Sequence, residues 1–141
     1  MDSRIQDLAH NLVSYSCRLE AGEKVLIHVF GQSAYPLAQA LVKETYKAGA
    51  VPYVQLEDYS INRQLLLGCT EEQLAFSNRL ELERMKEMDA YIGIRGGNNS
   101  NEQCDVPSNN TQIYSQYYAH PVHHDLRVKK TKWVVLRYPN P

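Results

Sequence analysis

The chain has 141 residues, enough for one domain built around a single hydrophobic core. Its 15 basic and 16 acidic residues are spread along the whole length and sum to a net charge of −1, which argues against a surface for nucleic acid or an anionic membrane. The sequence lacks an apolar run of the roughly 18 residues that a membrane helix needs, and its amphipathic N-terminus does not resemble a secretory signal.

The beginning of the chain predicts an amphipathic helix followed by a buried strand. Apolar residues recur at helical spacing from Ile5, and Asp2 or Ser3 can cap this helix. The run of residues 24–30 is apolar on both faces except for His28, which is typical of a strand covered by helices on two sides. We interpret His28 as a hydrogen-bonded core residue rather than as a ligand.

A second helix and a second strand are expected next. Ser33 is the predicted N-cap, and Pro36 falls in the first helical turn, where its missing N–H removes no hydrogen bond. Gly49 ends this helix. Residues 51–56 form the predicted second strand, with Pro52 tolerated near its beginning.

Three helix starts are predicted before the third strand. Ser60 is expected to cap a short helix that ends at Gly68. Thr70 begins the string TEEQ and Asn78 begins NRLE, and each has a Glu or Gln three residues later, as in a capping box. Residues 90–95 are then the predicted third strand.

The last part of the chain predicts a polar loop, a helix from about Thr111 and a fourth strand from Lys132. Strands that alternate with helices predict an α/β fold of three layers, in which a mostly parallel sheet of about four strands carries helices on both faces. We treat residues 1–141 as a single α/β domain. The proline-containing end, YPNP, is typical of a linker, so we expect the chain to be part of a longer protein.

Common catalytic and nucleotide-binding motifs are missing from the sequence. The string FGQSAYP after the first strand is neither GxGxxG nor a phosphate loop, and there is no GxSxG. Glu57 and Asp58 are neighbours on a strand and point to opposite faces, so we do not expect them to act on one substrate atom. The three cysteines, Cys17, Cys69 and Cys104, form no CxxC pair, which indicates a reducing cytoplasm rather than disulfides or a thiolate zinc site.

Three of the five histidines, His120, His123 and His124, lie in the string AHPVHHD. On a continuous helix His120 and His124 would share a face, as in helical zinc sites. Pro121 interrupts that helix, and catalytic zinc normally takes three protein ligands, so we interpret the segment as a solvated basic helix. A metal-binding protein built on these three histidines is an alternative hypothesis.

Several strings, taken in order, resemble the N-terminal domain of the M29 family of metallo-aminopeptidases, the thermophilic aminopeptidase group. They are LAHNLVSYSCRLEAGEKVLI at residues 8–27, ALVKETYKAGAVPYVQLED at 40–58, EEQLAF at 71–76, MDAYIGIRGGNN at 88–99 and KWVVLRYPNP at 132–141. Each string alone is weak evidence, but their order and spacing cover nearly the whole chain.

The resemblance implies a dimeric, cytoplasmic exopeptidase that removes N-terminal residues from peptides with two divalent metal ions, which are zinc, cobalt or manganese. It implies two-metal hydrolysis in which a Glu acts as general base. The family's metal ligands and its catalytic Glu and Tyr lie in a C-terminal catalytic domain that this sequence does not include. We therefore assign no catalytic residue and no metal ligand here, and expect this chain to be inactive alone.

For this chain, the resemblance implies an accessory domain that lines and restricts the catalytic cleft. The expected cleft-facing residues are Arg95, Gly96 and Asn98, after the third strand, and a plain turn in which Arg95 pairs locally is the competing interpretation. The expected partners are the protein's own C-terminal catalytic domain, peptide substrates and a second copy in a homodimer, with neither nucleic acid nor a membrane. The alternative function is a stand-alone α/β ligand-binding or assembly module without catalysis.

Overall fold

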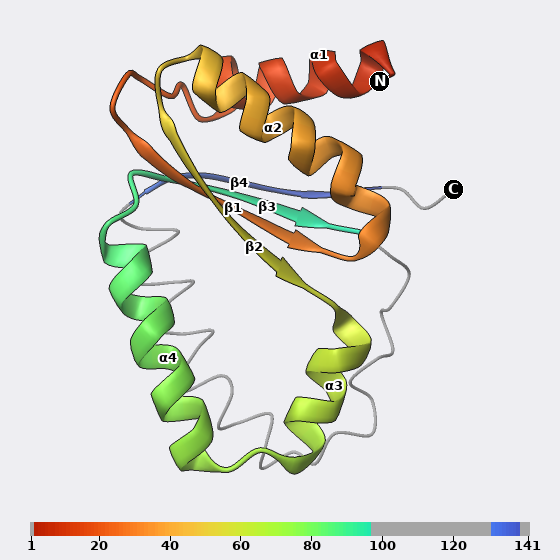
Figure 1. The fold of residues 1–141 in the computed structure, drawn as a ribbon, viewed down its shortest axis with the longest axis vertical. Coiled ribbons are helices and arrows are strands. Elements are labelled where there is room, and N and C mark those ends of the chain that lie inside the picture. Colours follow the sequence, from red (N-terminus) through yellow and green to blue (C-terminus); the bar gives the residue numbers. More distant parts are fainter. Residues whose placement is uncertain (1, 97–130, 139–141) are drawn as a thin grey trace.

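The computed structural model describes residues 2–96 and 131–138, which form a parallel sheet with helices on both sides (Figure 1). The helices are α1 (Ser3–Asn11), α2 (Tyr35–Lys47), α3 (Tyr59–Gly68) and α4 (Glu71–Lys86), and the strands are β1 (Lys24–Phe30), β2 (Val51–Glu57), β3 (Ala90–Arg95) and β4 (Lys132–Arg137). A π-helical turn, η1 (Leu12–Ser16), follows α1, and a 3-10 turn, η2 (Gln32–Ala34), precedes α2. In these residues no helix is long and apolar enough to cross a membrane.

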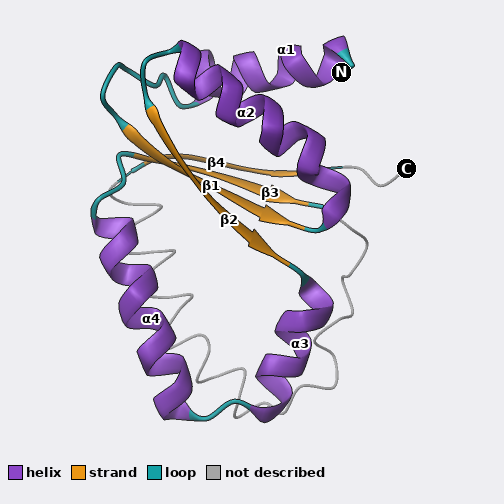
Figure 2. Ribbon diagram, in the orientation of Figure 1, coloured by secondary structure: helices purple, strands orange, loops and turns teal. Residues whose placement is uncertain are grey.

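The four strands are all parallel and lie in the order β2-β1-β3-β4 (Figure 2). Helices α1 and α2 cover one face of the sheet, while α3 and α4 lie on the other side (Figure 1). Parallel neighbours need long crossover connections, and these connections are the helices of an alternating sequence. The predicted α/β class is therefore confirmed.

The two faces of the sheet differ in how they are buried. On the face of α1 and α2, alternate residues of the central strands join one large apolar cluster with both helices: Val25, Ile27, Val29, Ala90, Ile92 and Ile94. On the opposite face a smaller cluster joins Leu26 and Tyr91 to Met85 and Met88 near the end of α4. Burying one such aliphatic side chain contributes about 1.5–3 kcal/mol. Because the cluster under α1 and α2 holds many more buried side chains, that face supplies most of the apolar stabilisation.

The N-caps of α2 and α3 differ from the predictions. Ser33 lies inside the 3-10 turn and Ala34 takes the N-cap position of α2. Asp58, not Ser60, caps α3, because its carboxylate accepts the N–H groups of Ser60 and Ile61. These bonds, with that from the Ser60 hydroxyl foremost, lower the pKa of Asp58. Asp58 and Ser60 both have side chains that can cap a helix. Because β2 ends at Glu57, the helix begins directly after Asp58, and Asp58 becomes the cap.

The capping box at Thr70 is confirmed, but the second predicted box is wrong. The Thr70 hydroxyl accepts the Gln73 N–H at 3.1 Å, and the Gln73 side chain accepts the Thr70 N–H. Helix α4 then continues through Asn78, which is buried. Once a helix has begun, each added residue gains a hydrogen bond, so an internal Asn with a following Glu does not restart it.

Cys17 is a buried thiol at the end of the π-helical turn. It is 1% exposed, and burial raises its pKa from 9.0 to about 11. Because the thiolate is the reactive form, we expect iodoacetamide to modify Cys17 at least about a hundredfold more slowly in the native than in the unfolded chain. Timed alkylation at pH 8 followed by peptide mass spectrometry measures both rates, and similar rates would contradict this burial.

The same shift has a consequence for stability. The unfolded chain releases the thiol proton near pH 9.0, whereas the native chain retains it until about pH 11. The contribution of Cys17 to the free energy of unfolding is therefore present below pH 9.0 and is lost as the pH rises toward 11.

Candidate functional site

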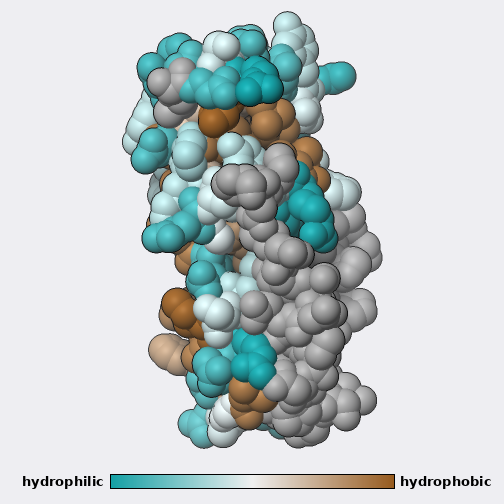
Figure 3. Space-filling view, turned by 90° about the vertical axis from the view of Figure 1, so that its right-hand side faces the viewer, coloured by the Kyte–Doolittle hydropathy of each residue, from teal (hydrophilic) through white to brown (hydrophobic). Residues whose placement is uncertain are grey.

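The last residues of the four strands form one row at the carboxyl edge of the sheet. The register pairs Glu57 of β2 with Phe30 of β1, Phe30 with Arg95 of β3, and Arg95 with Arg137 of β4. Side chains in register on neighbouring strands share a face, and this row faces the side of α3 and α4. Ligands of open parallel sheets bind beyond the carboxyl ends of the strands. Figure 3 looks onto this carboxyl edge, where the described residues form both hydrophilic and hydrophobic patches.

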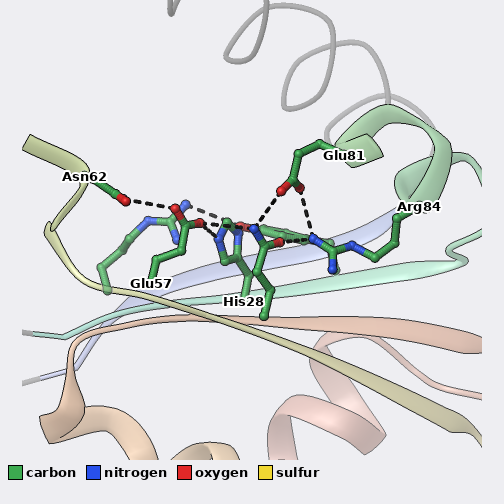
Figure 4. Close-up of polar contacts among 8 residues, drawn as sticks. His28, Glu57, Asn62, Glu81 and Arg84 are labelled. Carbon is green, nitrogen blue, oxygen red and sulfur yellow. Dashed lines mark hydrogen bonds and ion pairs between the residues drawn. The ribbon is translucent and has the colours of Figure 1, made fainter. Parts of the chain in front are cut away.

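A hydrogen-bond chain runs through the fully buried His28. Its Nδ1 lies 2.8 Å from the Tyr91 hydroxyl, and its Nε2 contacts the Glu57 carboxylate (Figure 4). With Glu57 ionised and the imidazole neutral, Nε2 donates to the carboxylate and Nδ1 accepts the Tyr91 O–H. Arg95 Nη2 donates to the same hydroxyl at 3.4 Å. The interpretation of His28 as a hydrogen-bonded core residue is confirmed.

Gly93 makes this chain sterically possible. A Cβ at position 93 would lie 3.0 Å from both Cε1 and the hydroxyl of Tyr91 and 3.2 Å from Cγ2 of Val135. The Tyr91 side chain therefore passes over bare backbone to reach His28. A glycine inside a strand often marks such a close approach, and this was the signal in AYIGIR that could have identified Tyr91.

Side-chain hydrogen bonds also tie both helices of this face to β2. Gln55 Nε2 donates to Glu81 of α4 at 2.8 Å, and Arg84 Nη2 donates to Glu81 at 3.0 Å and to the Gln55 carbonyl (Figure 4). From α3, Asn62 Nδ2 donates to Glu57 at 3.0 Å. This face thus combines a small apolar cluster with a polar network, unlike the apolar face under α1 and α2.

Arg95 lies on an aromatic stack. Its guanidinium carbon is 4.2 Å from the centroid of the Phe30 ring, which in turn stacks on Tyr59 with 5.1 Å between centroids. Burial raises the pKa of Tyr59, and the charges of Arg95 and Arg137 oppose that rise. Among the described residues, Nη1 of Arg95 is buried without a hydrogen-bond partner. The guanidinium group of Arg95 is therefore held by Phe30 and Tyr91, and its Nη1 has no acceptor among the described residues.

The three site residues predicted from the sequence have different positions in the structure. Arg95 belongs to the row and does pair locally, with Tyr91 and Phe30. Gly96 is buried, and its N–H donates to the Phe30 carbonyl at 2.7 Å. Asn98 lies outside the described residues, as do the predicted helix from Thr111 and the histidines of AHPVHHD. That the three candidates face a catalytic cleft stays a prediction.

The described residues do not fit the two-metal centre that the family resemblance implies. Within residues 2–96 and 131–138, no group of three or more His, Cys, Asp and Glu side chains could hold a metal ion. The pair His28 and Glu57 does not replace such a group, because both ring nitrogens of His28 are hydrogen-bonded. We assign no step of metal chemistry to these residues.

Known proteins resemble this chain in sequence family and in fold. The family model described as thermophilic metalloprotease (M29) matches residues 1–141. Wild-type AmpT from Thermus thermophilus has a similar fold, with a TM-score of 0.72 and 19% sequence identity over 99% of this chain and 36% of that chain. CurK enoyl reductase has a TM-score of 0.44 and 15% identity over 96% of this chain and 42% of its own, too low to carry an argument. No curated protein matches the sequence.

Proposed function

Because the chain belongs to the thermophilic metalloprotease (M29) family, we propose that it is the part of a metallo-aminopeptidase that shapes access to the active site without binding metal. The parent enzyme releases N-terminal residues from peptides by hydrolysis at two divalent metal ions, which are zinc, cobalt or manganese and are held by a separate catalytic domain. This chain alone is inactive. The observation that carries the proposal is the family match over all of residues 1–141.

The length of the solved relative supports a separate catalytic part. The chain spans 36% of AmpT, so an enzyme of that length has room for another domain. At the carboxyl edge, Arg95 and Arg137 offer cationic groups beside the ring of Tyr59, and such groups suit contacts with a peptide better than bond cleavage. We further propose that the parent protein is a cytoplasmic homodimer in which this part docks on its own catalytic domain.

Hydrolysis of leucine p-nitroanilide tests the proposal. The purified 141-residue chain is expected to show no turnover with added cobalt, zinc or manganese, and to retain less than one metal ion per chain by elemental mass spectrometry after desalting. The product of the complete reading frame is expected to hydrolyse the amide and to retain two metal ions per chain.

Three results would contradict parts of this proposal. Metal-dependent turnover by the 141-residue chain would show that it holds a complete catalytic site. An inactive product of a longer reading frame would contradict the aminopeptidase assignment. A stop codon directly after Pro141 would favour the stand-alone binding or assembly module instead.

A further inference from the structure

Two arginines lie side by side at the carboxyl edge of the sheet. Arg95 ends β3, Arg137 ends β4, and the two are register partners that face the side of α3 and α4. The salt bridges within the described part of the chain involve neither of them. Like charges in neighbouring positions of a sheet repel each other, so the placement of Arg137 beside Arg95 does not itself stabilise the fold.

The carboxylate in the same row is already engaged. Glu57 lies on β2, at the other end of the row, where it is bonded to His28 and to Asn62. Two strands, β1 and β3, separate β2 from β4. Glu57 is therefore held away from Arg137.

Arg95 is prepared for an anion by its surroundings. The Phe30 ring and the Tyr91 hydroxyl hold the guanidinium group in place, and its buried Nη1 has no acceptor among the described residues. Arg137 is exposed and so adds a second, accessible guanidinium group beside it. Guanidinium groups bind carboxylates through paired, charge-assisted hydrogen bonds. An anion bound here would accept a hydrogen bond from Nη1 of Arg95, and its negative charge would offset the repulsion between Arg95 and Arg137.

We propose that Arg95 and Arg137 form a carboxylate subsite that takes the C-terminal carboxylate of a short peptide substrate. The assignment of the ligand rests on the proposed function, because an aminopeptidase substrate has its reacting end at the N-terminus and leaves its C-terminus for a distant contact. The buried Phe30 ring, stacked on Tyr59, supports Arg95 from below and fixes the position of the subsite. The subsite would make the parent enzyme prefer short peptides with a free C-terminus.

A titration of the 141-residue chain with the tripeptide Leu-Gly-Gly and with its C-terminal amide tests this subsite. In phosphate-free buffer, nuclear magnetic resonance is expected to show shifts of the Arg95 and Arg137 side-chain N–H signals with the free acid. The amide is expected to bind at least tenfold more weakly, because it lacks the charge that the arginines bind. Equal binding of the acid and the amide, or binding of neither, would overturn the proposal.

Single substitutions locate the subsite. Arg137→Gln and Arg95→Gln are each expected to weaken binding of the acid about tenfold. Arg137→Gln is the safer variant for folding, since its side chain is exposed. Arg4→Gln removes the same charge from α1, on the opposite face of the sheet, and is expected to leave the affinity unchanged (Figure 1). Equal losses in all three variants, or no loss in Arg137→Gln, would overturn the assignment.

An acetate titration separates the two sources of a carboxylate. If the subsite takes a peptide C-terminus, acetate is expected to bind at least tenfold more weakly than Leu-Gly-Gly, because it lacks the peptide groups next to the carboxylate. Acetate that matches the tripeptide would indicate a site for any carboxylate, including an acidic side chain of the catalytic domain, and would overturn the substrate assignment. Failure here leaves the proposed function standing, because that function is tested by metal content and turnover.

Discussion

Replacement of Tyr91 by alanine is expected to lower the free energy of unfolding by about 3–5 kcal/mol, the usual range for truncating a buried aromatic side chain. Tyr91 is 0% exposed and packs against Leu26, Met85 and Met88. The truncation leaves a cavity on the less apolar face of the sheet and removes the hydroxyl that bonds His28. Urea unfolding followed by circular dichroism measures the change.

Tyr91→Phe is the matched variant, because it keeps the ring and removes only the hydroxyl. We expect a loss of about 1–3 kcal/mol, since Nδ1 of the buried His28 loses its donor and Arg95 loses its acceptor. A loss below about 0.5 kcal/mol would contradict the hydrogen-bond chain, because it would lie within the range of ordinary surface substitutions. A loss as large as that of Tyr91→Ala would mean that the hydroxyl, not the packing of the ring, supplies the stability.

Gly96→Ala is expected to destabilise the chain by about 1–3 kcal/mol, the range for overpacking a filled site. The added Cβ would lie 2.8 Å from the Phe30 carbonyl oxygen and 2.9 Å from the Ser33 hydroxyl. The carbonyl belongs to the backbone at the end of β1 and already accepts the Gly96 N–H at 2.7 Å. One of the two backbones must therefore move.

Gly68→Ala provides the control for this substitution. Among the described residues, no atom lies within 4 Å of a Cβ at position 68, and the residue ends α3. There the change is expected to be neutral or stabilising by up to about 1 kcal/mol, since alanine restricts the unfolded chain more than glycine does. Thermal unfolding of both variants tests the pair. Equal melting temperatures would show that the backbone contact at Gly96 relaxes without cost.

The strands were predictable from sequence because the pattern of apolar residues is local. The runs at residues 24–30 and 90–95 are apolar on both faces, as burial between two layers of helices requires, and both became central strands. Helix starts were less predictable. Ser33, Ser60 and Asn78 all have side chains that can cap, yet none of them caps a helix in the structure. For Ser33 and Ser60 the cap depends on where the preceding strand ends, which is set by pairing across the sheet, whereas Asn78 lies inside a helix that had already begun.

The site was predictable only in part. The resemblance to M29 proteins pointed to Arg95, Gly96 and Asn98 together, on the loop after the third strand, and the rule for parallel sheets marks the same loop. A Cβ on Gly96 would meet the Phe30 carbonyl and the side chains of Ser33 and Ala34, and whether Gly96 also faces a cleft stays a prediction. Tyr91 was missed, because a tyrosine inside an apolar strand looks like an ordinary core residue. Arg137 also ends a predicted strand, but its place beside Arg95 follows only from the register of β3 and β4.

The sequence by itself determined the α/β class, the four strands and the family of this protein. Hydrophobic periodicity reports burial along the chain, and the ordered strings extend over nearly all of it. Only the tertiary structure decided that Glu57, Phe30, Arg95 and Arg137 form one row, with the His28 chain behind it. Their register depends on pairing between strands that long crossovers separate in sequence, and no local pattern encodes which residues face one another across those crossovers.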